Sequence, residues 1–310
     1  FNYTFLILAL GSETNYFDIP GLREHALSLK RFEDAVRIRN KVERVLTEQH
    51  ELTLVVGGAG SSGIELISEL SNFICYLVVK IRQSRTERIL RNPTCPVRLI
   101  LVEASGTILS GFDSRIIQRT AARLAKLGIE IHTSSRIASV APKEIMLSDE
   151  KIIPYDILVW TGGIAGNPFC GAQNLPVTNK KNCVVNEFLQ IDNHTFAIGD
   201  MAGFIDAHTR KPLPWNVPVA EHEARTVAQN ILREIKGRPP LPFRPAQKYP
   251  YVFAIGRKYA IADLIFIRFW GFAGCCAKLL VELRYLLFIL PFPHAIRVWL
   301  KSIRVYTSND

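Results

Sequence analysis

The stretch from Leu52 to Glu65 places an apolar strand, a glycine-rich turn and the start of a helix in immediate succession. Within its sequence, LTLVVGGAGSSGIE, the glycines at 58, 60 and 63 form a G-x-G-x-x-G pattern. In such a turn Gly58 allows the tight bend, Gly60 lets the backbone approach a pyrophosphate, and Gly63 lets the helix pack closely on its strand. The helix start adds free N–H groups and the positive end of its dipole. The pattern therefore predicts an α/β domain that binds a dinucleotide.

A second apolar run, Val97–Val102, ends in the acidic residue Glu103. An acid at this position bonds a ribose 2′-hydroxyl and repels a 2′-phosphate, which favours NAD(H) over NADP(H). The distance from Gly58 to Glu103 exceeds the usual roughly 20 residues. We therefore expect an extended helix between them, over Ser68–Leu90. The alternative is a strand, loop and helix that bind nothing.

The net charge of +10 is concentrated at the end of the chain. Residues 236–310 hold twelve Lys or Arg and three acidic residues, which is nine of the ten net positive charges. The same segment contains the most hydrophobic part of the sequence, Ile261–Leu300. Basic and apolar residues together indicate an anionic lipid surface. A nucleic-acid surface is disfavoured, because the basic residues alternate with large aliphatic ones instead of forming a solvated patch.

This tail is predicted to lie in the membrane interface and not to span the bilayer. Its longest uncharged run, Tyr285–Ile296, is shorter than the roughly 20 residues that a span requires. Pro291 and Pro293 are expected to divide it into two helices, Cys275–Leu290 and His294–Ile303. A dimer interface and a buried pair of core helices are the alternatives.

Five motifs occur in an order that points to a family. They are YTFLILALGSETNYFDIPG, VVGGAGSSGIELISEL, VRLILVEAS, PYDILVWTGG and FAIGDMAG. The chain resembles the flavoprotein disulfide reductase superfamily, whose members have two dinucleotide domains. Within it the sequence is most similar to the type II NADH dehydrogenases, single-chain NADH:quinone oxidoreductases that lie on the membrane without pumping protons. The run GRKYAIADL and the following KLLVELRYLLFIL also resemble that family's membrane-binding domain, in which a helical hairpin follows a short sheet.

The resemblance implies roles for the residues of the NAD(H) domain. Gly58, Gly60, Gly63 and Glu103 would hold NADH. Gly162 and Gly163, in the TGG turn, would close this domain beside the nicotinamide. Glu65 matches an acidic position near the nicotinamide and the flavin, and it is the predicted catalytic residue.

The resemblance also implies part of an FAD site. Asp200, in the IGD motif, would bond the ribityl chain, and Gly199 would allow close approach of the backbone. Gly11 would lie near the flavin nucleotide at the first crossing between domains. The alternative is that Asp200 only forms the turn after a buried strand, Thr195–Ile198.

Two departures from the family pattern are present. The family's glycine motif for the flavin ADP would lie upstream of Phe1, where the sequence begins directly with a predicted strand. The chain is therefore expected to be a fragment of a longer protein or to hold flavin weakly. In the helix Trp215–Ile231, the family's Ala-Gln pair at the quinone site is replaced by Val217 and Pro218. Glu221 and His222 are the nearby polar residues, and His222 is expected to be an ordinary helix-surface histidine.

The six cysteines show no C-x-x-C or C-x-x-x-x-C pair and no metal-ligand spacing, so no metal site is expected. We expect buried free thiols. The alternative is a relative of the sulfide:quinone oxidoreductases, which use separated cysteines at the flavin. Cys170 would be the candidate in that case.

Together these features predict an α/β protein with two Rossmann-like domains, the FAD one incomplete, and an amphipathic, helical C-terminal membrane-binding region. The predicted parts are 1–48 (FAD domain remnant and linker), 49–165 (NAD(H) domain), 166–235 (FAD domain return) and 236–310 (membrane-associated domain). The predicted function is transfer of electrons from NADH through FAD to a membrane quinone. The protein is expected on a membrane surface, at the cytoplasmic face of the inner membrane, with a homodimer as one option. The competing hypotheses are a sulfide-oxidising flavoenzyme and a nucleotide-binding protein without catalysis.

Overall fold

The computed structural model describes residues 2–49, 51–84 and 97–308. The chain forms two compact units, each built from two stretches of sequence. Unit 1 comprises Phe1–Asn15 and Ile164–Pro250, and unit 2 comprises Tyr16–Gly163 and Tyr251–Asp310. The four-part division predicted from the sequence is finer than this partition and stays a prediction.

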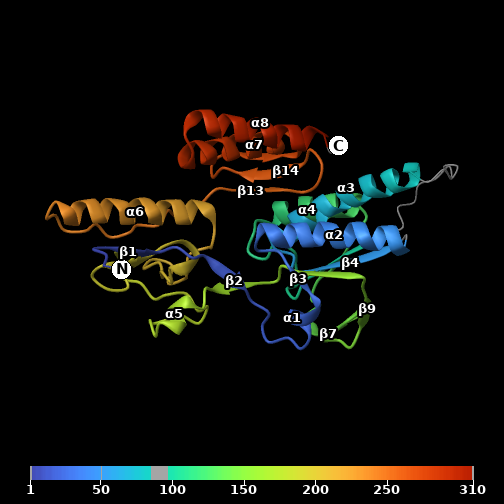
Figure 1. Cartoon of the computed structure of the whole chain (residues 1–310), viewed down its shortest axis with the longest axis horizontal. Helices are drawn as coiled ribbons and strands as arrows, with labels where there is room; N and C mark the ends of the chain where they lie inside the picture. Colours follow the sequence, from blue (N-terminus) through green and yellow to red (C-terminus); the bar gives the residue numbers. More distant parts are fainter. Residues whose placement is uncertain (1, 50, 85–96, 309–310) are drawn as a thin grey trace. The chain divides into compact units, whose positions relative to one another are not determined.

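Within the described residues, unit 2 is organised around a five-stranded parallel sheet of order β3-β10-β4-β5-β6 (Figure 1). The strands are β3 (Leu27–Ser28), β4 (Leu52–Gly57), β5 (Val97–Val102), β6 (Ile129–His132) and β10 (Ile157–Trp160). The three central strands β10, β4 and β5 are mainly apolar because both faces of the sheet are covered there, whereas the edge strand β6, IEIH, alternates apolar and polar residues. The expected strands at 52 and at 97–102 are confirmed. They are neighbours in register, with Leu52 opposite Val97 and Gly57 opposite Val102.

Alternate residues of β4 enter two different cores, as the two-residue period of a strand requires. Leu54 and Val56 pack beneath the helices α2 (Phe32–Gln49), α3 (Ser61–Ser84) and α4 (Ser114–Lys126). Val55 points to the opposite face. That face is covered by α1 (Leu22–His25) and an antiparallel sheet of β7 (Ile137–Ala141), β8 (Glu144–Leu147) and β9 (Ile152–Pro154). The unit therefore has the layered α/β architecture that the sequence predicts.

Helix α3 follows the glycine-rich turn directly. Over Ser61–Lys80 it is the one described helix whose length and hydropathy would suit a membrane span, and 44% of that window is buried in the protein. Ile64, Ile67 and Ile74 are fully buried members of the unit 2 core, which accounts for this apolar composition. The predicted continuation of the helix toward Leu90 lies outside the described residues.

The C-terminal part of unit 2 is a small antiparallel sheet followed by a helical hairpin. The sheet contains β13 (Tyr251–Ala254), β14 (Ala260–Asp263) and β15 (Arg268–Trp270), and the helices are α7 (Gly271–Ile289) and α8 (Phe292–Ser308). The expected order of sheet and hairpin is confirmed, with the break at Pro291. Both helices begin earlier than the predicted Cys275 and His294. Helix α7 lies so close to β14 that a Cβ at Gly274 would overlap the carbonyl oxygen of Ala260.

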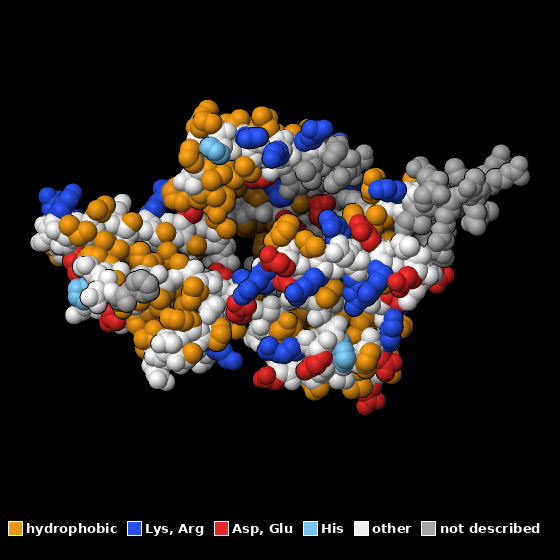
Figure 2. Space-filling model, in the orientation of Figure 1, with side chains coloured by type: hydrophobic (Ala, Val, Ile, Leu, Met, Phe, Trp, Pro, Cys, Tyr) orange, Lys and Arg blue, Asp and Glu red, His pale blue; other side chains and the backbone are white. Residues whose placement is uncertain are grey.

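The hairpin is joined internally by side chains and exposes large apolar ones. Trp299 donates its indole N–H to the carbonyl of Leu279 at 2.7 Å, which joins α8 to α7. Phe272 and Phe292 are 66% and 68% exposed, and Phe266, in the loop before β15, is 94% exposed. Figure 2 shows the visible face of this region, where apolar side chains are interspersed with Lys and Arg. Such a surface is unusual for a protein face that meets only water.

Unit 1 contains two short two-stranded sheets and a long helix. β1 (Leu6–Leu8) pairs in parallel with β12 (Thr195–Ala197), and β2 (Ser12–Thr14) pairs antiparallel with β11 (Ile164–Gly166). The turn η1 (Gly199–Met201) follows β12, while α5 (Phe169–Ala172) and α6 (Val217–Ile235) complete the unit. Asn216 caps α6 by accepting the N–H of Val219 at 3.0 Å. The helix therefore begins two residues after the predicted start at Trp215 and ends at Ile235 instead of Ile231.

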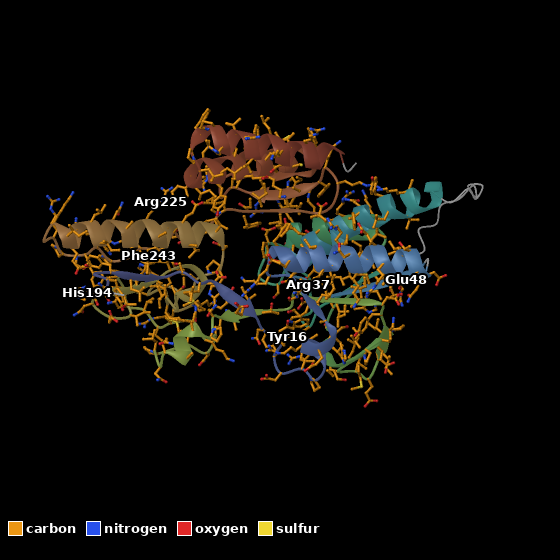
Figure 3. The ribbon with its side chains drawn as sticks, in the orientation of Figure 1. Tyr16, Arg37, Glu48, His194, Arg225 and Phe243 are labelled. Carbon is orange, nitrogen blue, oxygen red and sulfur yellow. A yellow bond between two sulfur atoms is a disulfide. The ribbon has the colours of Figure 1, made fainter. Side chains whose placement is uncertain are left out.

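Phe243, labelled in Figure 3, lies in the segment that follows α6, and its ring packs back against that helix. Its ring packs edge-on against that of His222, with centroids 4.9 Å apart. It also packs against Phe204, with centroids 5.1 Å apart. Phe204, Phe243 and Val227 thereby belong to one buried cluster beneath α6.

The expectation that all cysteines are free thiols is wrong for two of them. Cys170, in α5, and Cys183 form a disulfide with their Cα atoms 5.8 Å apart. Both residues are fully buried beside Met201 and Ala202. Their 13-residue separation matches neither of the spacings sought in the sequence, so only the fold brings them together. Cys75, Cys275 and Cys276 take no part in this disulfide; Cys275 is buried as expected, whereas Cys75 and Cys276 are exposed. Cys95 lies outside the described residues.

Candidate dinucleotide sites

The glycine-rich turn of unit 2 has the geometry that its three glycines predict. Gly58 adopts φ +107°, and a Cβ there would lie 2.6 Å from the backbone nitrogen of Gly162. A Cβ at Gly63 would overlap the carbonyl oxygen of Gly58. At Gly60 a Cβ would meet nothing within 4 Å. The outer two glycines are thus needed by the fold, whereas Gly60 leaves open space in which a pyrophosphate fits.

Glu103 follows β5 and lies against this turn. Its Oε2 accepts the N–H of Ala59 at 2.7 Å, and its Oε1 accepts the N–H of Ser105 at 2.8 Å. The carboxylate therefore fixes the middle of the glycine turn as well as its own loop. This contact with Ala59 was not anticipated from the sequence. The predicted bond from Glu103 to a ribose hydroxyl stays a prediction.

The TGG turn after β10 packs against the glycine turn. Thr161 donates its backbone N–H to the carbonyl of Gly57 at 2.8 Å, and its hydroxyl donates to the carbonyl of Gly58 at 3.0 Å. A Cβ at Gly162 would collide with the ring of Trp160, and one at Gly163 would collide with that of Phe17. The carboxyl ends of β4, β5 and β10 therefore meet, which is where ligands bind in parallel α/β sheets.

Glu65 lies in the first turns of α3 and contacts the C-terminal sheet. Its Oε1 accepts the N–H of Ala254, at the end of β13, at 2.9 Å. Burial raises the pKa of the Glu65 carboxyl, against the opposing effects of this hydrogen bond and of Lys278. The predicted catalytic residue is thus a partly buried carboxyl between α3 and the C-terminal sheet. No signal in the sequence identified Ala254 or Lys278 as its neighbours.

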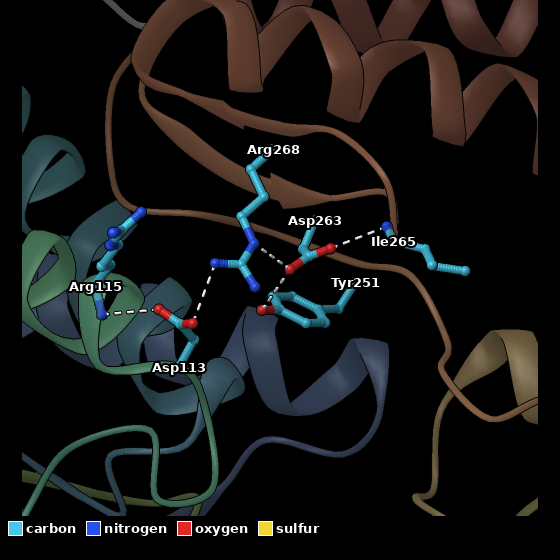
Figure 4. A network of polar contacts seen from close by, with 6 residues as sticks. All are labelled: Asp113, Arg115, Tyr251, Asp263, Ile265 and Arg268. Carbon is cyan, nitrogen blue, oxygen red and sulfur yellow. Dashed lines mark hydrogen bonds and ion pairs between the residues drawn. The ribbon is translucent and has the colours of Figure 1, made fainter.

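A second polar network joins the same sheet to α4 (Figure 4). Arg268 lies 2.8 Å from Asp263 and 3.2 Å from Asp113, the residue that caps α4 by accepting the N–H of Arg115. Tyr251 donates its hydroxyl to the same Asp263 oxygen at 3.3 Å. Burial and this carboxylate raise the pKa of Tyr251 to about 12, so the phenol keeps its proton. The network helps to hold the C-terminal sheet against the nucleotide-binding part of unit 2.

The residues predicted for the flavin lie together in unit 1. Because β1 and β12 are parallel and adjacent, the turns that follow them are neighbours. Gly11 and Gly199 occupy these turns with φ values of +72° and +62°. The hydroxyl of Ser12 donates to Oδ2 of Asp200 at 2.5 Å. A Cβ at Gly11 would meet nothing within 4 Å, so the site has room for a ligand at the carboxyl ends of two parallel strands.

Glu223 is a residue of this region that the sequence interpretation missed. It lies on α6, and its Oε2 accepts the N–H of Gly199 at 2.5 Å. Its side chain is only 1% exposed. The sequence carries a signal for it, because Val219, Glu223 and Val227 recur at a spacing of four residues and so share one face of the helix. In the structure all three are buried. Glutamate side chains are rarely fully buried, so a glutamate on the apolar stripe of a helix is unusual.

The start of α6 was predicted to line a quinone site. Val217 is exposed there, and Pro218 occupies the first turn of the helix. Glu221 and His222 follow in the next turn, and His222 contacts Phe243 with its ring. These contacts show where the residues lie, and their assignment to a quinone stays a prediction.

The comparisons with known proteins agree with this architecture. The sequence pattern of the family described as pyridine nucleotide-disulphide oxidoreductase matches residues 1–224. The chain is 31% identical over 288 residues to the probable NADH dehydrogenase of Dictyostelium discoideum, covering 88% of this chain and 61% of that protein. It is 30% identical over 250 residues to the mitochondrial internal alternative NAD(P)H-ubiquinone oxidoreductase A1 of Arabidopsis thaliana, covering 76% of this chain and 47% of that protein.

Solved structures share the fold. The structure of NDH2 from Plasmodium falciparum in complex with NADH superposes with a TM-score of 0.79 at 19% identity, over 97% of this chain and 78% of that one. An NAD-dependent persulfide reductase from A. fulgidus gives a TM-score of 0.63 at 20% identity, over 84% of this chain and 44% of that one.

The chain spans about three-fifths of the Dictyostelium relative and about half of the Arabidopsis one. The resemblance to type II NADH dehydrogenases is confirmed by these relatives. From the family match over residues 1–224, with two glycine-bearing sites of the expected kind, the chain belongs to the pyridine nucleotide-disulphide oxidoreductase family.

Proposed function

We propose that the protein oxidises NADH and delivers the electrons, through FAD, to a membrane quinone. The observation that carries the proposal is the turn between β4 and α3, where Gly60 leaves room for a pyrophosphate and Glu103 fixes the backbone. The names of the relatives, NADH dehydrogenase and NAD(P)H-ubiquinone oxidoreductase, support the same donor and acceptor.

The residues of unit 2 have separate roles in this proposal. Gly58 and Gly63 shape the turn, Gly60 gives the NADH pyrophosphate access to the backbone, and the N-terminus of α3 adds its dipole. Glu103 bonds the ribose and repels a 2′-phosphate. Gly162 and Gly163 close the site beside the nicotinamide.

The flavin would be held in part by Gly11, Gly199 and Asp200, with Asp200 receiving hydroxyls of the ribityl chain. Bound FAD supplies the chemistry, because it accepts a hydride from reduced nicotinamide and returns its two electrons to a quinone. The protein's task is then to bind and orient the two dinucleotides. Ser12 supports this task by fixing one oxygen of Asp200.

Glu65 is proposed as the catalytic residue because it is a partly buried carboxyl at the start of the nucleotide-binding helix. Burial raises its pKa toward the range in which a carboxyl exchanges protons near neutral pH. Its hydrogen bond from Ala254 links this carboxyl to the sheet that precedes the hairpin.

The hairpin α7–α8 is proposed as the membrane contact through which a lipid quinone reaches the protein. Exposed Phe272 and Phe292, with exposed basic residues of the hairpin such as Arg297 and Lys301, fit an interfacial position on anionic lipid. The name of the Arabidopsis relative, an NAD(P)H-ubiquinone oxidoreductase, supports a quinone as the acceptor that such a surface would serve. The cytoplasmic face of the inner membrane, and assembly as a homodimer, stay predictions.

A short-chain quinone assay tests the proposal. The full-length protein should reduce the quinone with NADH, and Gly60→Val should lose this activity by a large rise in the KM for NADH. Absence of NADH-dependent reduction in the unmodified protein would refute the proposal. Activity with sulfide in place of NADH would instead support the sulfide alternative. The Cys170–Cys183 disulfide is fully buried, so neither of its sulfur atoms is exposed to sulfide in solution.

A further inference from the structure

Glu223 occupies an uncommon position for a carboxyl. It lies on the buried stripe of α6 with Val219 and Val227, and it is 1% exposed. Another buried polar residue of this helix, Asn230, is a neutral amide that exchanges two hydrogen bonds with the backbone of Leu241, at 2.9 and 2.8 Å. The described contacts give Glu223 one hydrogen bond, from the N–H of Gly199. A charge buried with so little compensation is costly.

The partner of Glu223 belongs to the turn that carries Asp200. Gly199 begins η1, Asp200 is its second residue, and Asp200 is bonded to Ser12. The turn is thus held from two sides, by Glu223 through the backbone and by Ser12 through the Asp200 side chain. A change at Glu223 would be transmitted directly to the position of Asp200.

The charged and titratable groups around Glu223 disfavour its ionised form. Asp200, on η1, is a second carboxyl close enough to act on it, and Tyr249, before β13, is a phenol coupled to it. Asp206 acts on the same Tyr249. On its own helix the nearest charged residues in sequence are Glu221 and Arg225. Burial, and then the Asp200 charge, raise the pKa of Glu223 to about 8, against the opposing hydrogen bond from Gly199.

We propose that Glu223 is a positioning residue of the flavin site, and that in its protonated form it holds the Gly199–Met201 turn so that Asp200 is available to the ribityl chain. This inference rests on the proposed function, because it concerns the flavin site named there. Ionisation would leave a buried carboxylate beside Asp200. The turn would then have to move to admit water, and the flavin would lose its support.

The test is the pH dependence of flavin affinity in the full-length protein, measured by flavin fluorescence on dilution. Affinity of the unmodified protein should fall by about tenfold between pH 7 and pH 9, because at pH 9, one unit above a pKa of about 8, only about one molecule in ten keeps the proton on Glu223. Glu223→Gln keeps an oxygen for the Gly199 N–H and cannot ionise. It should therefore bind flavin as tightly as the unmodified protein does at pH 7, with no decline at pH 9.

Two further variants make the test specific. Glu223→Ala removes the acceptor and should weaken flavin binding at both pH values. Glu234→Gln removes a carboxylate from the same helix away from the turn, and it should keep the pH dependence of the unmodified protein. A flat profile in the unmodified protein, or an unchanged decline in Glu223→Gln, would overturn the inference.

The outcome also separates this inference from the proposed function. Flavin that binds with the expected pH profile but is not reduced by NADH would refute the function and leave the role of Glu223 intact. Flavin that is reduced by NADH but binds independently of pH would refute the role of Glu223 and leave the proposed function intact. Absence of flavin binding at every pH would refute both.

A second readout does not depend on flavin. The unfolded chain holds Glu223 near its ordinary pKa of 4.5, whereas the folded chain holds it near 8. Between these values the folded state binds the additional proton, so the contribution of Glu223 to stability falls as pH rises. The Tm of the flavin-free protein should therefore decline less from pH 5 to pH 8 in Glu223→Gln than in the unmodified protein. Equal declines would contradict the protonated state.

Discussion

Single residues of the nucleotide turn can be separated into those that the fold needs and those that a ligand needs. Gly63 faces the carbonyl of Gly58, whereas Gly60 faces open space. A side chain added at Gly60 should therefore affect ligand binding, and one added at Gly63 should affect stability. This contrast distinguishes a binding site from a loop that happens to be rich in glycine.

Gly60→Val should leave the Tm nearly unchanged and weaken NADH binding by an order of magnitude or more, because the side chain fills the space for the pyrophosphate. Gly63→Ala should lower the stability by about 1–3 kcal/mol, since its Cβ forces the helix away from the strand. Thermal unfolding measures the stability of both variants, and titration with NADH measures their affinity for NADH. Equal NADH affinity in Gly60→Val and the unmodified protein would exclude this turn as the binding site.

Glu103 is expected to set the choice between NADH and NADPH. Glu103→Gln keeps an oxygen for the N–H of Ala59 or Ser105 but removes the charge that repels a 2′-phosphate. The ratio of NADPH to NADH dissociation constants should fall by about tenfold, the equivalent of about 1.4 kcal/mol. Glu130→Gln, on the next strand, removes an equal charge and serves as the control. A ratio that is the same in Glu103→Gln and the unmodified protein would contradict the assignment.

At the scale of elements, the sequence predicts what depends on local patterns. Three elements are predictable because the spacing of apolar residues and the effects of glycine and proline act over a few residues. They are the strand at Leu52, the strand at Val97–Val102 and the hairpin broken at Pro291. Contacts between distant segments are not predictable in this way. The hydrogen bond from Ala254 to Glu65 joins residues 189 apart in the chain. The pairing of Cys170 with Cys183 likewise depends on how α5 folds back beside η1.

The disulfide should stabilise the elements around η1. Replacing Cys170 and Cys183 with Ala removes a cross-link between residues 13 apart, and it should lower the free energy of unfolding by about 3 kcal/mol. Urea unfolding with and without a reductant measures the change in the free energy of unfolding. The double variant should be insensitive to the reductant, and Cys75→Ala, at an exposed cysteine outside the disulfide, should behave like the unmodified protein. If the unmodified protein unfolds at the same urea concentration before and after complete reduction, the cross-link contributes nothing to the free energy of unfolding.

At the scale of the whole molecule, charge and exposed apolar surface accumulate in the last part of the chain. The α7–α8 hairpin combines aromatic side chains with a positive net charge, which suits an anionic bilayer surface (Figure 2). The proposed membrane contact can be tested without removing the hairpin, because Phe266, Phe272 and Phe292 are exposed and support little of the fold.

Exchanging Phe266, Phe272 and Phe292 for Ser should release the protein from anionic vesicles, because each aromatic ring loses about 2 kcal/mol of burial. Co-sedimentation with vesicles containing anionic phospholipid measures the bound fraction. Phe32→Ser, at an aromatic residue of α2 that is 79% exposed, is the matched control and should bind as the unmodified protein does. Undiminished sedimentation of the triple variant would place the membrane contact elsewhere.

Passage of electrons from NADH through a bound flavin to a quinone can be followed in the visible absorption spectrum of the purified full-length protein. The spectrum is recorded under anaerobic conditions, before and after addition of NADH and then of a short-chain quinone. We expect flavin bands that bleach with NADH and return with the quinone. Flavin bands that NADH leaves unchanged, or a spectrum without flavin, would contradict the proposed function.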